Sequence, residues 1–212
     1  MARLSNLECK FGQNQWTTYQ KRERLPQFQV FAEKVKKRDF NTCRFCGFTA
    51  EEGMHVVNLD HNYSNNIASN LVTSCPLCSQ CLFIEQIGCG DNNGGVLIYM
   101  PEISQADLNG LTHALFCAIA NGTMHESSAQ SIYNNLRLRA KTVESVYGEG
   151  RSEPKVFGKM VINTPTSNAD ALHKEILKDL RVLANISSFS DQIKTWSKQA
   201  AGTLNTSMEQ SQ

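Results

Sequence analysis

Residues 43–48 read Cys-Arg-Phe-Cys-Gly-Phe, and residues 75–81 read Cys-Pro-Leu-Cys-Ser-Gln-Cys. Each stretch contains a Cys-x-x-Cys knuckle, in which one tight turn presents two thiols to the same metal ion. Zinc in structural sites prefers four such soft ligands in a tetrahedron, with no position left open for water. The spacing therefore predicts one structural zinc ion per chain, which organises the first half of the protein. Its predicted ligands are Cys43, Cys46, Cys75 and Cys78.

The composition favours metal binding over disulfide bonding. The chain of 212 residues has eight cysteines, a net charge of +1, 41% hydrophobic and 19% charged residues, which are values of an ordinary globular protein. No apolar run reaches the roughly 18 residues of a membrane-spanning helix, and the N-terminus lacks the apolar core of a secretory signal. We therefore expect a cytoplasmic protein, in which thiols stay reduced and available to metal.

The knuckles also fit two roles that involve no zinc. The four cysteines could be small buried residues, or one knuckle could be a redox dithiol, for which a second matching knuckle would be superfluous. Cys81 follows Cys78 closely and could face the same site or simply pack. We expect packing without ligation for Cys81 and for three more distant cysteines, which are Cys9, Cys89 and Cys117.

The apolar pattern predicts an α+β fold whose strands lie mainly in the cysteine-rich block. Residues 1–25 are polar and are expected to form an irregular arm, followed by a zinc-binding module at 26–90. Residues 91–201 are expected to form a mostly α-helical partner-binding region, and residues 202–212 a flexible tail. The boundary between module and helical region rests on the Gly- and Asn-rich run 88–95, which is typical of a loop.

Periodicity within these regions predicts individual elements. In the module, we expect a helix that begins at Pro26 and a strand at 54–59. In the second region, we expect strands at 96–100 and 159–163. Apolar residues at helical spacing predict helices at about 108–119, 132–147, 169–184 and 191–200. Ser104 is expected to cap the first of these.

Between the knuckles stand Leu59-Asp60-His61 and, further on, Asn70-Leu71. The order Cys-x-x-Cys, Asp-His, Asn-Leu, Cys-x-x-Cys resembles the zinc-knuckle branch of the HNH nucleases and implies their ββα-metal core. In that family the His is the general base that activates water, the Asp helps to bind a catalytic divalent ion, and the Asn orients the His. By position, these residues would be His61, Asp60 and Asn70.

The resemblance fails at two positions that catalysis requires. Active members carry Asn or His directly after the last knuckle cysteine, where this chain has Ser79, and often carry Lys three positions later, where it has Leu82. We therefore interpret Asp60, His61 and Asn70 as degenerate catalytic positions and expect no nuclease activity. A metal-dependent HNH endonuclease is the alternative.

Local charge supports a third hypothesis. Residues 21–44 hold eight Lys or Arg residues against three acidic ones. This excess could contact phosphate, while Trp16, Tyr19 and Phe45 stack on bases, as in a non-catalytic nucleic-acid-binding protein. The same features suit docking to an acidic protein partner, because aromatic and Arg residues often anchor interfaces. The small net charge of the chain does not favour nucleic acid as the partner.

A second resemblance covers essentially the whole chain. The strings Cys-Arg-Phe-Cys-Gly-Phe, Asn-Leu-Asp-His-Asn-Tyr and Cys-Pro-Leu-Cys-Ser-Gln-Cys are similar to those of the DotN (IcmJ) subunits of Dot/Icm, the type IVB secretion system. The resemblance implies a non-catalytic cytoplasmic subunit of the coupling-protein complex, which gathers effector proteins at the inner membrane for export. It also implies binding to the C-terminal extension of the coupling ATPase, DotL, beside the small acidic adaptors IcmS and IcmW.

Overall fold

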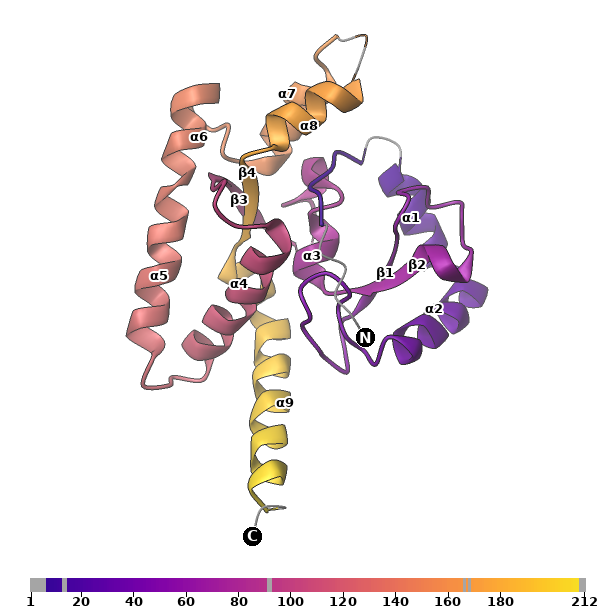
Figure 1. Cartoon of the computed structure of the whole chain (residues 1–212), viewed down its shortest axis with the longest axis vertical. Coiled ribbons are helices and arrows are strands. Elements are labelled where there is room, and N and C mark those ends of the chain that lie inside the picture. The colour runs from indigo at the N-terminus through magenta and orange to yellow at the C-terminus, as the bar shows by residue number, and fades with distance from the viewer. Residues whose placement is uncertain (1–6, 13–14, 91–92, 166, 168, 210–212) are drawn as a thin grey trace.

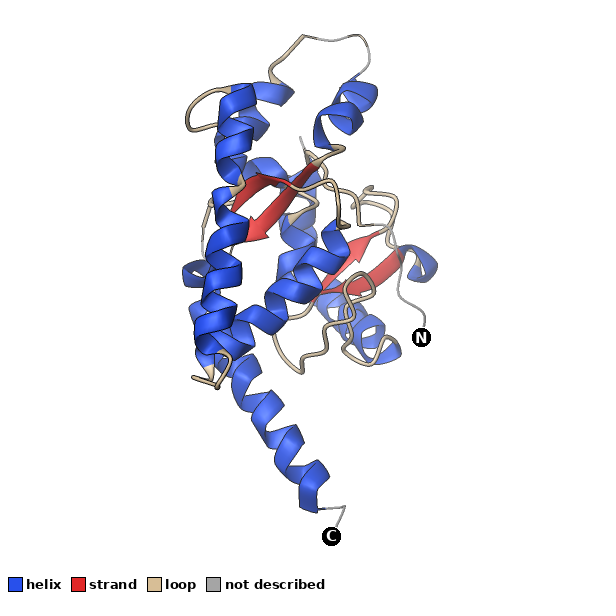
Figure 2. Cartoon of the chain, turned by 60° about the vertical axis from the view of Figure 1, so that its left-hand side comes forward, coloured by secondary structure: helices blue, strands red, loops and turns tan. Residues whose placement is uncertain are grey.

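A computed structural model describes residues 7–12, 15–90, 93–165, 167 and 169–209. The predicted α+β class is confirmed: a ββα module packs beside a mostly helical second half (Figure 1). Each half contains a two-stranded antiparallel sheet (Figure 2). Among the described residues, no helix combines the length and the apolar character needed to cross a membrane.

The first half is built from two helices, a hairpin and a short third helix. Its elements are α1 (Gln15–Glu23), α2 (Pro26–Arg38), β1 (His55–Asn58), η1 (Ala68–Asn70), β2 (Leu71–Ser74), α3 (Pro76–Gln80) and η2 (Ile84–Gln86). In the hairpin, His55 pairs with Ser74 and Asn58 with Leu71. The order β1–β2–α3 is the ββα arrangement that the HNH resemblance implies.

Helix α2 covers the hairpin with an apolar stripe. Phe28, Ala32 and Val35 recur at helical spacing and pack on Val56 of β1 and Leu71 of β2 in a small separate cluster. The helix begins at a proline, which suits the first turn because that position has no intrahelical partner for an N–H group. The predicted start of this helix at residue 26 is confirmed.

The irregular arm predicted for residues 1–25 is wrong over Gln15–Glu23, which form α1. Polar composition hid the reason, because one of the two buried side chains of this helix, Tyr19 and Arg22, is a charged one. Arg22 is only 3% exposed, and its guanidinium lies 4.1 Å from the ring centroid of Phe28. It donates hydrogen bonds to the backbone oxygen of Val56 at 2.7 Å and to the amide oxygen of Asn58.

The second half combines one sheet with helices on both sides. Its elements are β3 (Gly95–Tyr99), α4 (Gln105–Ala120), α5 (Glu126–Leu138), α6 (Ala140–Tyr147), α7 (Pro154–Ile162), α8 (Ala169–Leu177), β4 (Leu180–Ala184), η3 (Ile186–Phe189) and α9 (Ser190–Glu209). The N-cap of α4 is confirmed, since Ser104 Oγ accepts a 3.1 Å hydrogen bond from the Asp107 N–H.

Three predictions for the second half are wrong. The strand expected at 159–163 lies in α7, which starts at Pro154 and buries Phe157 and Val161. The helix expected from 169 to 184 ends at Leu177, and residues 180–184 form β4 because they pair with β3 across the sheet. The tail expected from residue 202 is part of α9 as far as Glu209.

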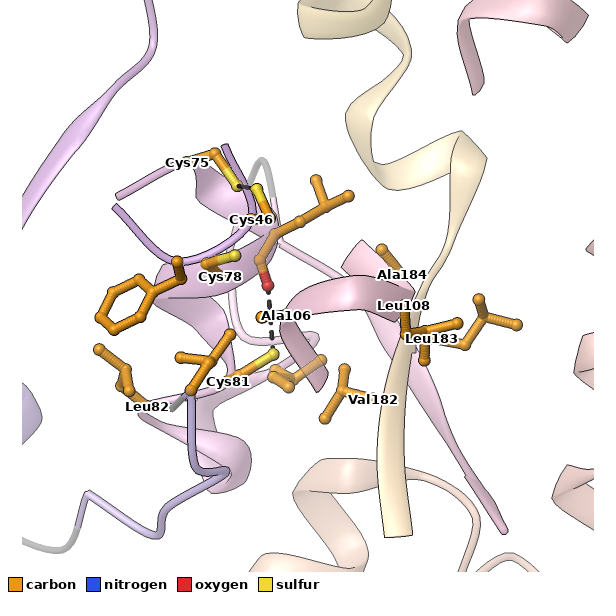
Figure 3. Packing of buried hydrophobic residues seen from close by; sticks show 14 of the residues in the cluster. Cys46, Cys75, Cys78, Cys81, Leu82, Ala106, Leu108, Val182, Leu183 and Ala184 are labelled. Atoms are coloured by element: carbon orange, nitrogen blue, oxygen red, sulfur yellow. Dashed lines mark hydrogen bonds between the residues drawn. The ribbon is translucent and has the colours of Figure 1, made fainter. Parts of the chain in front are cut away.

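One hydrophobic core joins the two halves. Leu77 and Cys78 of the ββα module belong to the same cluster as Leu97, Phe157 and Trp196 of the second half. Figure 3 shows Cys46, Cys75, Cys78 and Cys81 of the first half in one cluster with Ala106 and Leu108 of α4 and the β4 residues Val182 to Ala184. The predicted boundary falls beside positions 91 and 92, which lie outside the described residues.

Candidate metal centre

The first knuckle is a turn closed by backbone hydrogen bonds. Gly47 adopts a φ of 82°, in the left-handed region that favours glycine, and its N–H donates to the Cys43 carbonyl at 2.9 Å. The Cys43 N–H in turn donates to the Phe48 carbonyl at 2.7 Å. These bonds point Cys43 and Cys46 inward from one loop.

The second knuckle is the start of a helix. Cys75 is the N-cap of α3 and Pro76 occupies the first helical turn. The N–H of Cys78 donates to the Cys75 carbonyl at 3.1 Å, so both thiols project from one turn. The two knuckles meet because the Arg44 N–H of the first donates to the Thr73 carbonyl of β2 at 2.9 Å, and β2 leads directly into α3.

The structure brings the four predicted cysteines together. Their sulfur atoms all lie within 4.8 Å of one another, and Cys46 Sγ is 3.6 Å from Cys75 Sγ. A tetrahedron of Zn–S bonds of about 2.3 Å has sulfur–sulfur edges of about 3.8 Å. Three of the residues have 0% exposure and Cys46 has 8%. The sulfur group therefore has the donor type, spacing and enclosure to hold a metal ion.

The pKa values of these thiols support the same conclusion. Burial raises the pKa of Cys75 and of Cys78 well above the ordinary value. Burial also acts to raise the pKa of Cys43, but hydrogen bonds from the other three thiols outweigh it and lower this pKa. Four buried thiolates repel one another, so full deprotonation of the group requires a bound cation.

Two polar residues of α4 reach the sulfur group, and sequence reasoning missed both. The side-chain amide of Asn109 donates to Cys78 Sγ at 3.2 Å, and His113 Nε2 lies 3.2 Å from Cys75 Sγ. The sequence feature that could have indicated them is the spacing of four residues between Asn109 and His113, which places two polar side chains on one face of an otherwise apolar helix. Nothing in the sequence showed that this helix packs on the knuckles.

Cys81 lies outside the four-sulfur group. Its thiol donates to the Leu77 carbonyl at 3.2 Å, a bond drawn in Figure 3. It also lies 3.7 Å from the Asn109 amide nitrogen. Cys9 donates to the side-chain oxygen of Gln105 at 3.2 Å. Both contacts fit the packing role expected for these cysteines.

The Asp and Asn of the HNH-like motif bond to each other. The Asp60 carboxylate accepts hydrogen bonds from the Asn62 N–H at 2.9 Å and from the amides of Asn65 and Asn70 at 2.6 and 2.9 Å. Asn70 also accepts from the Asp60 N–H at 3.1 Å. Asn70 thus orients Asp60, and the carboxylate closes a turn.

His61 faces a cavity of about 140 Å³ whose lining includes Lys10 and Leu82. Burial, followed by the charge of Lys10, lowers the pKa of His61 to about 4, so the ring is neutral at physiological pH. Ser79 is buried and donates to the Pro76 carbonyl at 3.2 Å. Ser79 and Leu82, which stand where active HNH nucleases carry catalytic residues, are therefore both buried in the protein.

The aromatic residues of the nucleic-acid hypothesis belong to the core. Tyr19 and Phe45 are buried, and the Trp16 ring packs edge-on against Phe83 at 5.0 Å. Among the basic residues, Arg22 is buried and Arg44 lies 3.4 Å from Asp39. Tyr19 and Phe45 are therefore not presented for stacking on bases, and Trp16 is partly buried against the core.

The fold and the sulfur group define a class, a ββα protein with four clustered cysteines that could hold a metal ion. No family model matches the chain. Over 185 aligned residues the chain is 43% identical to the type 4 apparatus protein DotN of Legionella pneumophila. The alignment covers 87% of this chain and 86% of the relative. The chain therefore belongs to the DotN family, and the resemblance inferred from its motifs is confirmed.

Proposed function

We propose that this chain is a non-catalytic, zinc-stabilised subunit of a type IVB secretion coupling-protein complex that binds the C-terminal extension of the coupling ATPase. The observation that carries the proposal is its identity to a secretion apparatus protein along most of both chains. Recruitment to the inner membrane and contact with adaptors of the IcmS and IcmW type belong to the same proposal.

Zinc is the metal that the sulfur group suits best. The proposed ligands are Cys43, Cys46, Cys75 and Cys78, and four thiolates favour zinc over harder cations such as Mg²⁺. The group is closed by protein on all sides, which suits a structural ion and leaves no entry for a substrate.

A scaffold role agrees with the state of the HNH-like positions. The Asp60 carboxylate is held by three hydrogen bonds within its own turn. A catalytic Mg²⁺ is usually bound through carboxylates and water. The position directly after Cys78, where active HNH nucleases carry a residue of the catalytic metal site, is occupied here by the buried Ser79. The relative supports the same role, because it bears the name of an apparatus protein and not of an enzyme.

The helical region offers a surface for a partner. Helices α5 and α6 form a long rod at one side of the molecule (Figure 1). Their exposed apolar residues are Ile132 at 46%, Leu138 at 57% and Val146 at 68%, with Met124 at 91% in the turn before α5. We propose the exposed apolar side chains of α5, α6 and the turn before them as the contact region for the partner.

The direct test is isothermal titration of the full-length, zinc-loaded chain with the C-terminal extension of the coupling ATPase. We expect saturable binding that weakens at least tenfold in the double variant Leu138→Glu and Val146→Glu. Leu25→Glu is the matched control, since Leu25 is 54% exposed but precedes α2 in the other half. Absence of binding by a folded, zinc-loaded sample would contradict the proposal.

A nuclease assay separates the proposal from its enzymatic alternative. The chain is incubated with plasmid DNA and Mg²⁺, Mn²⁺ or Ni²⁺, with His61→Ala as the control. We expect intact plasmid in every sample, because the Asp60 carboxylate is engaged by three hydrogen-bond donors of its own turn and the position after Cys78 is the buried Ser79. Cleavage by the natural chain that disappears in His61→Ala would establish the endonuclease instead.

A further inference from the structure

Helix α4 runs directly beside the sulfur group and turns two polar residues toward it. Asn109 and His113 are four residues apart, so they lie on the same face of the helix, and they are only 1% and 4% exposed. Burial of an amide and an imidazole in an apolar core is unfavourable unless both make hydrogen bonds. Their hydrogen-bond partners in the metal centre are two cysteine sulfurs.

The Asn109 amide is held in one orientation by a chain of hydrogen bonds. Gln105 Nε2 donates to Asn109 Oδ1 at 2.9 Å, which directs Nδ2 of Asn109 toward Cys78 Sγ and the Leu77 carbonyl. Gln105 is fixed in turn by two bonds to the backbone of Val182, at 2.8 and 2.9 Å. The chain of bonds therefore runs from strand β4 to a sulfur of the second knuckle.

The His113 ring is held by aromatic contacts. It stacks on Phe48, which follows the first knuckle, with centroids 3.6 Å apart and planes inclined by 2°. The Trp196 ring of α9 meets it edge-on at 5.1 Å. Nδ1 of His113 has no hydrogen-bond partner among the described residues, so Nε2 is the nitrogen that bonds, and it lies 3.2 Å from Cys75 Sγ.

Four thiolates around a divalent cation carry a net charge of −2 in a core from which water is excluded. Hydrogen bonds from N–H groups to the sulfurs spread this charge and fix the direction of each ligand. We propose that Asn109 and His113 position the Cys78 and Cys75 thiolates and slow the release of zinc. The helical half then contributes to metal binding through these two hydrogen bonds. This inference rests on the proposed zinc site.

Two substitutions remove the donors while keeping the volume nearly constant. Asn109→Leu deletes the amide, and His113→Phe deletes the nitrogens but retains the stacking on Phe48 and Trp196. Thr112→Val is the matched control, because Thr112 is fully buried on the same helix and its hydroxyl bonds only to its own helix, at the Leu108 carbonyl.

The readouts are the rate of zinc transfer to a chelator and the absorption spectrum of the Co²⁺-substituted chain. Loss of such an outer hydrogen bond typically lowers metal affinity by about 10–100-fold, so we expect faster zinc release of that order from both variants and a shifted sulfur-to-cobalt band. Thr112→Val should behave as the natural chain, and Asn109→Gln, which keeps an amide, should recover part of the loss.

Unchanged zinc release and spectra in both variants would overturn the inference, as would an equal change in Thr112→Val. If Asn109→Leu does not fold, His113→Phe, with its ring contacts preserved, decides the question. The two proposals fail in different ways. A natural chain without zinc contradicts the proposed metal site, whereas a zinc-loaded natural chain with unaffected variants contradicts only the role of α4.

Discussion

The two antiparallel strand pairs of this protein are both short, with four and five residues in each strand, but they join segments at very different separations in the sequence. Strands β1 and β2 pair residues 55–58 with 71–74, which are close in the chain, and the pairing leads straight into the second knuckle. Strands β3 and β4 pair residues 95–99 with 180–184, and helices α4 to α8 lie between them in sequence. The first pair is a local hairpin that ends at the candidate metal centre, and the second pair forms only when the core brings distant segments together.

The two strand pairs also differ in the interactions that stabilise them. Cys75 follows β2 directly, and Cys43 and Cys46 lie in the segment between α2 and β1, so a metal ion held by these cysteines would tie the strands of the first pair together. The second depends on burial, since Leu97, Val182 and Leu183 have no exposed surface. A change in the metal centre should therefore act first on the ββα module, and a change in the sheet core should act on both halves.

Loss of a metal ligand should have the largest effect. We expect Cys43→Ser or Cys75→Ser to yield insoluble or unfolded protein, because zinc binding in structural sites is worth about 10–16 kcal/mol, as much as the whole stability of a domain. The measurements are metal content by mass spectrometry and circular dichroism. Cys117→Ser, outside the sulfur group, should remain folded and loaded. A folded, soluble Cys43→Ser chain that keeps its zinc would refute the ligand assignment.

Truncation of a buried side chain in the sheet of β3 and β4 should have the second-largest effect on stability. Leu97→Ala should lower the free energy of unfolding by about 2–5 kcal/mol, because a fully buried side chain leaves a cavity. Val96→Ala on the other face of β3, where the side chain is only partly buried, should cost clearly less. Chemical denaturation monitored by both circular dichroism and zinc release is the measurement. Zinc retained through the unfolding of the helices would show that the halves are independent.

Asp39 gives a smaller effect that depends on pH. This buried residue at the end of α2 accepts hydrogen bonds from the Arg38 side chain at 2.9 Å and from the Thr73 N–H of β2 at 2.9 Å. Charged hydrogen bonds of this kind contribute about 1.5–3 kcal/mol, so Asp39→Asn should destabilise the chain by that order at neutral pH. It should leave the metal content unchanged.

The sign of the pH dependence follows from the pKa of Asp39. Burial acts to raise it, but hydrogen bonds from Arg38 and Thr73 outweigh burial and lower it below the ordinary value of about 3.9. A lowered pKa stabilises the fold above pH 4, and this contribution is lost as pH falls through the folded-state value. Thermal melts from pH 6 to pH 3 should therefore fall less steeply for Asp39→Asn. Parallel curves would contradict this assignment.

Asp60 should show the smallest effect, which tests whether the HNH-like motif is structural. Asp60→Ala removes the acceptor for three hydrogen bonds in an exposed turn and should cost about 1 kcal/mol. The control is Asp191→Ala, which breaks an exposed ion pair with Lys194 and should cost less than about 0.5 kcal/mol. Denaturant midpoints measure both. Loss of bound metal in Asp60→Ala would point to a metal function for this carboxylate.

Local patterns predicted the elements whose causes lie close together in the chain. The knuckle spacing, the proline at the start of α2 and the Ser104 cap each involve a few neighbouring residues, and the structure has all of them. Helix α1 escaped prediction because one of its two buried residues is Arg22, and composition alone marks an arginine as exposed. Strand β4 escaped because Leu180, Leu183 and their neighbours fit a helical stripe equally well until β3 is present to pair with them.

The sequence by itself determined which four cysteines cluster, the ββα module around them and the family, because each depends on residue types at short fixed spacing. Only the tertiary structure decided that α4 lies against the metal centre, with Asn109 and His113 facing two of the sulfurs. Contacts between residues about 30 to 40 positions apart carry no periodic signature of their own. They arise when the shared core forms, and burial of apolar surface then dictates which polar groups meet.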